Sequence, residues 1–201
     1  NDADNKEVTW SSSNTAVATV NNGKVTALKA GTTTITVKTT DGNKEASCVV
    51  TVLQPVTGVT LDSSELALVV GEDTTLVATV LPSDASNKAV TWTTSDASVA
   101  TVNNEGKVVA VGPGSAVITV KTTDGNKTSS CTVTVTQLVT GVTLDKEEAS
   151  VETNKTTTLV ATVLPANASN KDVVWTSSDK LIATVENGVV KGIAPGTAII
   201  T

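Results

Sequence analysis

The chain has 201 residues and a formal net charge of −6, with 39% hydrophobic but only 1% aromatic residues. The negative charge disfavours binding to a nucleic-acid backbone or to an anionic membrane surface. No run of about 18 apolar residues is present, so the sequence predicts no membrane-spanning helix. The chain contains no histidine, and it therefore lacks the usual side chain for acid–base catalysis at neutral pH and for metal binding.

The composition is typical of β-structure. Valine, isoleucine and threonine are abundant, and these residues fit a pleated, half-buried surface better than a helix. No segment shows the 3.6-residue periodicity of a helix over a useful length. The hydrophobic content and the low charge argue against disorder. The sequence therefore predicts an all-β protein.

The sequence repeats itself. The three tryptophans, Trp10, Trp92 and Trp175, follow one another at intervals of 82 and 83 residues, and Cys48 and Cys131 lie 83 residues apart. Such a period indicates a repeat architecture in which each copy builds its own core. The predicted domains are an incomplete one at 1–54 that lacks its first strands, a complete one at 55–137, and an incomplete one at 138–201 that lacks its last strand.

The first copy has no counterpart of residues 56–82 of the middle copy. We therefore expect the chain to be a segment of a longer array, with any targeting sequence outside it. The incomplete copies are predicted to be the least stable parts when the chain is expressed alone.

The complete copy is expected to contain seven or eight short strands joined by short turns. Apolar residues alternate along most of them, which predicts two antiparallel sheets packed face to face. Asp124-Gly125 is a strong signal for a two-residue hairpin turn. The predicted strands are Val59–Leu61, Leu66–Val69, Thr74–Leu81, Ala89–Thr94, Val99–Val102, Lys107–Val111, Ser115–Thr122 and Lys127–Val135.

Aromatic and sulfur-containing side chains share a strand face with valines. Trp10, Trp92 and Trp175 are predicted to anchor the three cores, rather than to form a sugar-binding platform on the surface. Cys48 and Cys131 are predicted to be small buried hydrophobic residues. A disulfide within one domain is excluded because no copy has more than one cysteine.

The joints between copies contain no flexible linker. Residues 52–56 and 135–139 have no glycine- or serine-rich run, so the last strand of one copy passes almost directly into the first strand of the next. Such joints are expected to be semi-rigid and to make the array a rod.

No catalytic, cofactor-binding or metal-binding residue is predicted. Serine and aspartate residues lie in turns with no base nearby in the sequence, and buried cysteines are poor nucleophiles. Calcium at the domain joints is the alternative considered, since oxygen-rich clusters occur there, but Asx turns explain these clusters better than a ligand set. The clusters are Asn1–Asn5, Asp84–Asn87 and Asp145–Glu148. Three glycosylation sequons, at Asn126, Asn154 and Asn167, carry no weight in a bacterial or phage protein, and no feature favours a lysine–asparagine cross-link.

Short motifs recur in all three copies. In the middle copy they include the strand Val90–Trp92, the apolar run Val99–Val102, the turn Pro113-Gly114 and the strand Ala116–Val120. This pattern resembles the bacterial Ig-like domain of group 2 over essentially the whole chain. The resemblance implies tandem Ig-like β-sandwiches, found in adhesins of the intimin and invasin kind, in secreted enzymes as accessory modules, and in phage virion proteins. It implies no catalytic residues.

These observations favour a non-catalytic spacer array in an extracellular or bacterial cell-surface protein, which projects a distal adhesive or other domain. The expected partners are the neighbouring Ig-like domains, a host-cell receptor or glycan, or other surface or virion subunits. One alternative is an adhesion module or a virion decoration, and another is an accessory module of a secreted polysaccharide-degrading enzyme. The hint of a binding surface is Lys180-Leu181-Ile182, which differs from its counterparts Thr15–Val17 and Ala97–Val99.

Overall fold

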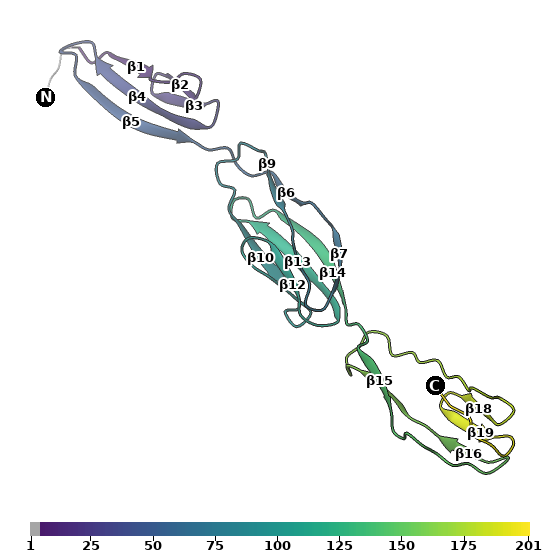
Figure 1. Cartoon of the computed structure of the whole chain (residues 1–201). Coiled ribbons are helices and arrows are strands. Elements are labelled where there is room, and N and C mark those ends of the chain that lie inside the picture. The colour runs from purple at the N-terminus through teal and green to yellow at the C-terminus, as the bar shows by residue number, and fades with distance from the viewer. Residues whose placement is uncertain (1–4) are drawn as a thin grey trace.

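The computed structural model describes residues 5–201, and every regular element in that part of the chain is a β-strand (Figure 1). Within residues 5–201 the strands form three groups, and no backbone ladder connects one group to another. The groups follow one another along one long axis, as Figure 1 shows. Among the described residues, no helix is long and apolar enough to cross a membrane.

The first group contains two antiparallel sheets. One has the strand order β1-β4-β5, and the other is the hairpin β2-β3. The strands are β1 (Val8–Ser12), β2 (Ala18–Asn21), β3 (Lys24–Ala27), β4 (Gly31–Thr39) and β5 (Glu45–Val52).

The middle group is the complete copy and has nine strands. Its sheets have the orders β10-β13-β14-β7, β11-β12-β8 and β6-β9. The strands are β6 (Gly58–Leu61), β7 (Glu65–Val69), β8 (Asp73–Thr75), β9 (Ala78–Leu81), β10 (Val90–Thr94), β11 (Ala100–Val102), β12 (Lys107–Ala110), β13 (Gly114–Thr122) and β14 (Thr128–Thr136).

Two details of the middle group differ from the sequence prediction. The segment 74–81 is two strands, because Leu76 turns into the core and β8 and β9 join different sheets. In addition, β7 pairs with β14 in parallel. The first strand of the copy pairs with β9 as β6 and then changes sheet, so its second half, β7, runs alongside β14 in the same direction.

The core of the middle copy lies between these sheets. Ile118, Cys131 and Val133 are fully buried in one cluster, and Leu61, Leu66 and Leu68 pack against it. A second cluster contains Val56, Val59, Val80, Ala85 and Val120. Trp92 packs against both clusters. The prediction that Trp92 anchors the core of this copy is therefore confirmed.

The third group has the sheets β15-β17 and β16-β19-β18. Its smaller core contains Leu159, Ala183 and Val190, and Trp175 packs against it as predicted. The strands are β15 (Gly141–Leu144), β16 (Thr156–Thr158), β17 (Ala161–Leu164), β18 (Ala183–Glu186) and β19 (Val189–Gly192).

In the first copy, the predicted burial of two side chains is wrong. Cys48 is exposed, whereas its counterpart Cys131 is completely buried. Trp10 is 38% exposed. The reason is that three leucines from residues 56–82 pack against the cluster that contains Cys131, and the first copy has no counterpart of that segment in this chain.

Candidate functional site

The first joint is held by hydrogen bonds from both sides. Val52, the last residue of β5, pairs with Gly31 in the first copy. Two residues later, the backbone N–H of Gln54 donates to Ser86 Oγ at 2.8 Å, and the backbone N–H of Ser86 donates to the Gln54 carbonyl at 2.9 Å. Only Leu53 lies between these two sets of bonds.

The second joint repeats this arrangement. The backbone N–H of Gln137 donates to Ser169 Oγ at 2.8 Å, and the N–H of Ser169 donates to the Gln137 carbonyl at 2.9 Å. The preceding residue, Thr136, is still in the β14 ladder, and its carbonyl accepts a hydrogen bond from Val70 at 2.9 Å. Here no residue lies between the bonds to the two copies.

The loops that carry the two serines are fixed in the same way. Each loop begins at a cis proline, Pro82 or Pro165, whose carbonyl accepts a hydrogen bond from the backbone N–H of a buried alanine. These alanines, Ala85 and Ala168, directly precede the serines and bury their side chains in the copy that follows the joint. The position of the serine hydroxyl is therefore set by the core.

A hairpin tip closes the first joint from the other side. The carboxylate of Asp124, at the β13–β14 turn, accepts a hydrogen bond from the backbone N–H of Val56 at 2.9 Å. A Cβ at Gly125 would lie 3.0 Å from the Val56 carbonyl oxygen, so the turn approaches the joint closely. Val56 itself is buried. The segment that enters the middle copy is therefore fixed within a few residues of Leu53.

The sequence analysis predicted short joints but did not identify the residues that hold them. The signal that could have found them is a shared spacing: each glutamine is followed 32 residues later by the serine that binds it. The alternative at the joints was calcium, and the described residues contain no group of three or more acidic or cysteine side chains that could hold a metal. Of the predicted clusters, Asn1–Asp4 lie outside the described residues.

The other two clusters make local hydrogen bonds. Asn87 Oδ1 accepts the backbone N–H of Ala89 at 3.0 Å, which is an Asx turn. Asp145 Oδ1 accepts the backbone N–H of Val160 at 2.7 Å, and the other carboxylate oxygen lies 3.7 Å from Lys146 Nζ. These contacts involve one acidic or amide side chain of each cluster, Asn87 and Asp145.

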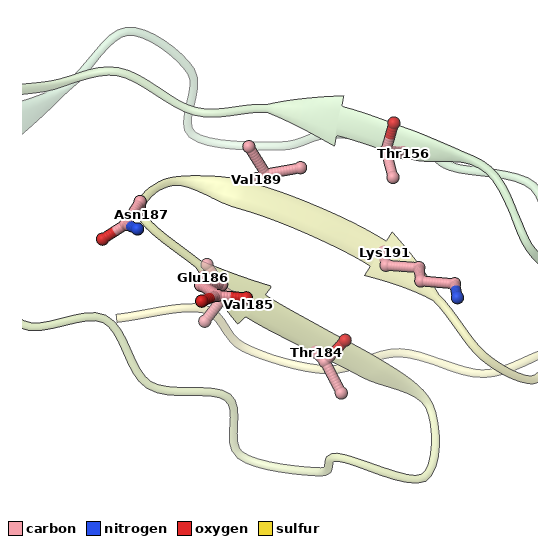
Figure 2. Close-up of a pocket in the computed structure, with 7 residues that line it drawn as sticks. All are labelled: Thr156, Thr184, Val185, Glu186, Asn187, Val189 and Lys191. Atoms are coloured by element: carbon pink, nitrogen blue, oxygen red, sulfur yellow. The ribbon is translucent and has the colours of Figure 1, made fainter.

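A shallow hollow of about 520 Å³ lies over the third copy (Figure 2). Figure 2 shows Thr156, Lys191 and Thr184 on the neighbouring strands β16, β19 and β18, where they form one cross-strand row. Val189, which also lines the hollow, occupies the position that Lys107 holds in the middle copy. There Lys107 pairs with Asp73 at 3.1 Å. The hollow lies where the surface residues differ between the copies. Its lining residues do not form an arrangement of acid, base and nucleophile.

The predicted binding hint is on the surface. Leu181 is 80% exposed and Lys180 is also exposed, and the counterparts of Leu181 in the other copies, Ala16 and Ser98, are exposed as well. At these two positions the other copies have Thr15-Ala16 and Ala97-Ser98, so the leucine and the lysine distinguish the third copy at this turn.

Comparison with known families identifies the repeat. The family model described as bacterial Ig-like domain (group 2) matches residues 1–50, 55–133 and 138–201. The chain belongs to this family. The fold class predicted from the sequence, tandem Ig-like β-sandwiches, is therefore confirmed.

Relatives carry such domains in different settings. An Ig-like virion protein of Serratia phage KSP90 is 46% identical over 140 residues, which cover 67% of this chain and 54% of that protein. An uncharacterized protein of Clostridium acetobutylicum is 44% identical over 147 residues, covering 72% of this chain and 15% of that protein. The kappa-carrageenase of Pseudoalteromonas carrageenovora is 44% identical over 80 residues, covering 40% of this chain and 20% of the enzyme. The chain thus spans from about one seventh to about half of the length of these curated relatives.

Among solved structures, domains 4 and 5 of the S-layer protein SbsC are similar to this chain. The match has a TM-score of 0.37 and 26% sequence identity, and it covers 65% of this chain and 70% of that structure.

Proposed function

We propose that this chain is a non-catalytic spacer, a stiff array of Ig-like domains that projects a distal domain from a bacterial surface or secreted protein. The observation that carries the proposal is the pair of joints. At each joint at most one residue lies outside the hydrogen bonds to the flanking copies. Interdomain motion that leaves these bonds intact is confined to the backbone torsions of at most one residue at each joint, whereas a glycine- or serine-rich linker would bend freely.

The proposal includes the domain boundaries and the location. The domains are 1–54, 55–137 and 138–201, with the boundaries directly after the two glutamines that the next copy binds. The neighbouring Ig-like domains are the immediate partners, and other subunits of the surface structure are the further ones. We place the chain outside the cell, at the bacterial surface or on a virion.

Small-angle X-ray scattering of the dilute chain tests the stiffness. A variant with a Gly-Ser-Gly-Ser insertion after Leu53 and after Thr136 is the flexible reference. We expect the natural chain to have a larger radius of gyration and a narrower ensemble than this reference. Identical profiles for the two chains would contradict the spacer proposal. A chelator is expected to leave the natural profile unchanged, because the chain itself makes the bonds at the joints.

The double variant Ser86→Ala and Ser169→Ala assigns the stiffness to the serine hydroxyls. Each substitution removes the acceptor of a glutamine N–H and is expected to broaden the ensemble toward that of the insertion variant. Ser83→Ala is the matched control, since it lies in the same loop and the third copy has alanine, Ala166, at this position. A profile of the double variant that equals the control would remove the serines from the mechanism.

A second candidate function is a virion or adhesion module that binds a partner directly. The identity of 46% to a phage Ig-like virion protein and the exposed Leu181 favour it. An accessory role beside a polysaccharide-degrading domain is supported more weakly, by the match to a carrageenase over 40% of this chain. Leu181→Ser, tested for binding to whole cells and to purified virions, distinguishes direct binding from the spacer role, because a spacer tolerates this substitution.

A further inference from the structure

The middle copy couples its entry segment directly to its exit strand. β7 pairs with β14 in parallel, from Glu65 opposite Thr132 to Val69 opposite Thr136. β14 ends at Thr136, and the joint to the third copy follows at once. Residues 55–64 connect the first joint to β7, with β6 as their one strand. The two parts of the copy that its neighbours hold are therefore bonded to each other within one sheet.

Hydrogen bonds close this strand pair at both ends. The backbone N–H of Thr132 donates to the Ser64 carbonyl at 2.9 Å. At the other end, the N–H of Val70 donates to the Thr136 carbonyl, also at 2.9 Å. The Thr136 hydroxyl donates to the Leu68 carbonyl at 3.3 Å. The bonds of a parallel ladder are evenly spaced between such ends, so neither end of the pair is left open.

Tension along the array acts on this pair in shear. The first copy pulls the middle copy at its entry segment, and the third copy pulls it at the end of β14 (Figure 1). Because β7 and β14 run in the same direction, these two forces slide one strand past the other along their length. All the hydrogen bonds of the pair then resist together. In an antiparallel hairpin pulled at its two neighbouring ends, the bonds would break one at a time.

The side chains of β7 lock its register. Leu66 and Leu68 pack against the buried cluster on one face of the strand. Glu65 and Ala67 are exposed on the other face. A slip of one residue would turn the glutamate toward the core and both leucines toward water. Sliding therefore costs apolar contacts in addition to hydrogen bonds.

The segment ahead of β7 is attached separately, because β6 pairs with β9 in another sheet. Directly after β6, the backbone N–H of Asp62 donates to the Val77 carbonyl at 3.1 Å, and its carboxylate accepts the Val77 N–H at 2.8 Å. Release of β6 therefore leaves β7 and β14 paired. The parallel pair is the last connection between the entry segment and the exit strand.

We propose that β7 and β14 form a tensile clamp, which keeps the middle copy folded while tension passes along the array and opens only when the two strands shear. The clamp adds a mechanical function to the proposed spacer and rests on it, because a chain transmits tension only when it is held at both ends. The stiffness of the joints and the strength of the clamp are separate properties. Scattering measures the first without load, and pulling measures the second.

Single-molecule force spectroscopy of the full chain, tethered at its two ends, measures the strength of the clamp. An insertion of about ten glycine and serine residues after Asn104 lengthens the unfolding step of the middle copy alone by roughly 3.5 nm. The insertion lies at a tip where the copies already differ in length, Asn21–Gly23 against Asn103–Gly106. The longer step identifies the middle copy in every trace.

Two substitutions at Val70 isolate the closing hydrogen bond. Val70→Pro removes the N–H that Thr136 accepts, and Val70→Ala keeps this N–H while also losing side-chain contacts with the core. We expect the rupture force of the marked step to be roughly twofold lower in Val70→Pro than in Val70→Ala. Val108→Ala is the control for stability, since Val108 is completely buried on β12 in the other sheet. It lowers the equilibrium stability and should leave the rupture force nearly unchanged.

The direction of pulling tests the clamp without altering it. A Val111→Cys substitution in a Cys48→Ser background provides a tether point, because Val111 is exposed and Cys131 is buried. This point lies near the end of β14, where the first residue of β13 pairs with Val135. Tension between it and the C-terminal end peels β14 from its end, and the step is recognised by its short length, residues 112–136. We expect a rupture force roughly twofold or more below that of the end-tethered chain.

Three results would overturn the proposal. The first is an equal rupture force for Val70→Pro and Val70→Ala. The second is a force for Val108→Ala as low as that for Val70→Pro, which would mean that the force follows overall stability. The third is an equal force for the two pulling directions; this arm keeps the natural β7 and β14 and so decides the proposal even if Val70→Pro does not fold. Any of these results beside a stiff scattering profile would remove the clamp and leave the spacer proposal standing.

Discussion

The first and the middle copies have nearly the same sequence along their last two strands, yet their side chains lie in different environments. Cys131 is completely buried in the middle copy, and Cys48 is exposed in the first. The strands that carry these residues have the same partners on one side, β13 and β4. The difference is the segment 56–82, which covers the second face. Burial in this fold is therefore decided by a segment more than 60 residues away, and local alternation shows only which side chains share a face.

A glycine at the tip of the β-hairpin gives the largest expected contrast between the two copies. Gly106 and Gly23 both have positive φ, at 81° and 77°. A Cβ at Gly106 would collide with the Leu76 carbonyl oxygen and lie 2.9 Å from Trp92, whereas at Gly23 it would meet only the ring of Trp10, at 3.2 Å. We expect Gly23→Ala to reduce the stability of its copy by about 1 kcal/mol, from backbone strain, and Gly106→Ala by about 3 kcal/mol, because the collision with the Leu76 carbonyl adds to the same strain. Urea unfolding, resolved by copy with hydrogen exchange and mass spectrometry, measures both.

If the two glycine variants lose equal stability, a backbone segment covers this turn in the first copy as the Leu76 backbone does in the middle copy. The comparison would then rest on the cysteines alone.

A buried valine gives the next contrast. Val133 is completely buried and its counterpart Val50 is only half-buried. Val133→Ala removes apolar contacts and leaves a cavity, and we expect it to cost about 2 kcal/mol. Val50→Ala is expected to cost less than about 1 kcal/mol, because part of its surface already contacts water. Native-state hydrogen exchange of β14 and β5 gives the two losses, and a greater loss at Val50 would contradict the order proposed here.

The joint gives a smaller contrast. Asp124 binds the backbone N–H of the buried Val56, and its counterpart in the first copy, Asp41, forms no side-chain hydrogen bond among the described residues. Asp124→Ala leaves that N–H without its acceptor and should cost about 1 kcal/mol of local stability at the joint. Asp41→Ala should have almost no effect. Amide exchange at Val56 is the measurement, and an unchanged rate in Asp124→Ala would show that water replaces the carboxylate without loss.

The sequence alone predicts the features that depend on a single strand and the turn next to it. The positions of most strands, the existence of a hairpin around Asp124-Gly125 and the core position of Trp92 follow from alternation and turn chemistry. The predicted two-residue length of that turn is wrong, because the N–H of Thr122 donates to the Lys127 carbonyl and four residues lie between them. The parallel pairing of β7 with β14 could not be predicted in this way. The first strand changes sheet, and the alternation of apolar residues does not indicate which strand is the partner. The exposure of Cys48 was missed for the same reason.

The candidate site was predicted only in outline. The short joints follow from the absence of glycine and serine between the copies. The bonds between Gln54 and Ser86 and between Gln137 and Ser169 use backbone groups and a serine in a distant loop, and nothing in the local sequence of either partner marks them. Only the equal spacing in two copies could have identified the pair.

The smallest contrast is an acid-dependent one, at the turn before β11. Asp96 Oδ1 accepts the hydroxyl of Ser98 at 2.6 Å and its backbone N–H at 2.9 Å, and these bonds lower the pKa of the Asp96 carboxyl. In the first copy Asn14 makes the equivalent turn, with Ala16 N–H as donor at 3.1 Å.

A carboxyl whose pKa is lowered by folding stabilises the folded state above its ordinary pKa, and this contribution is lost as the pH falls through the lowered value. The middle copy should therefore lose a small part of its stability on acidification below about pH 4, the ordinary range of aspartate. Asp96→Asn should remove that part of the pH dependence, and Asn14→Asp should create a smaller one in the first copy, because Ala16 donates its backbone N–H but has no hydroxyl like that of Ser98. The urea midpoints of the natural chain and of both variants are measured between about pH 2.5 and pH 7. The difference in midpoint between each variant and the natural chain isolates this turn, because the contributions of the other carboxylates are the same in both. If both substitutions leave the pH profile unchanged, the hydrogen bonds at this turn are equally strong with aspartate and with asparagine. The middle and the first copies would then differ only in the segment 56–82, which covers the core of the middle copy.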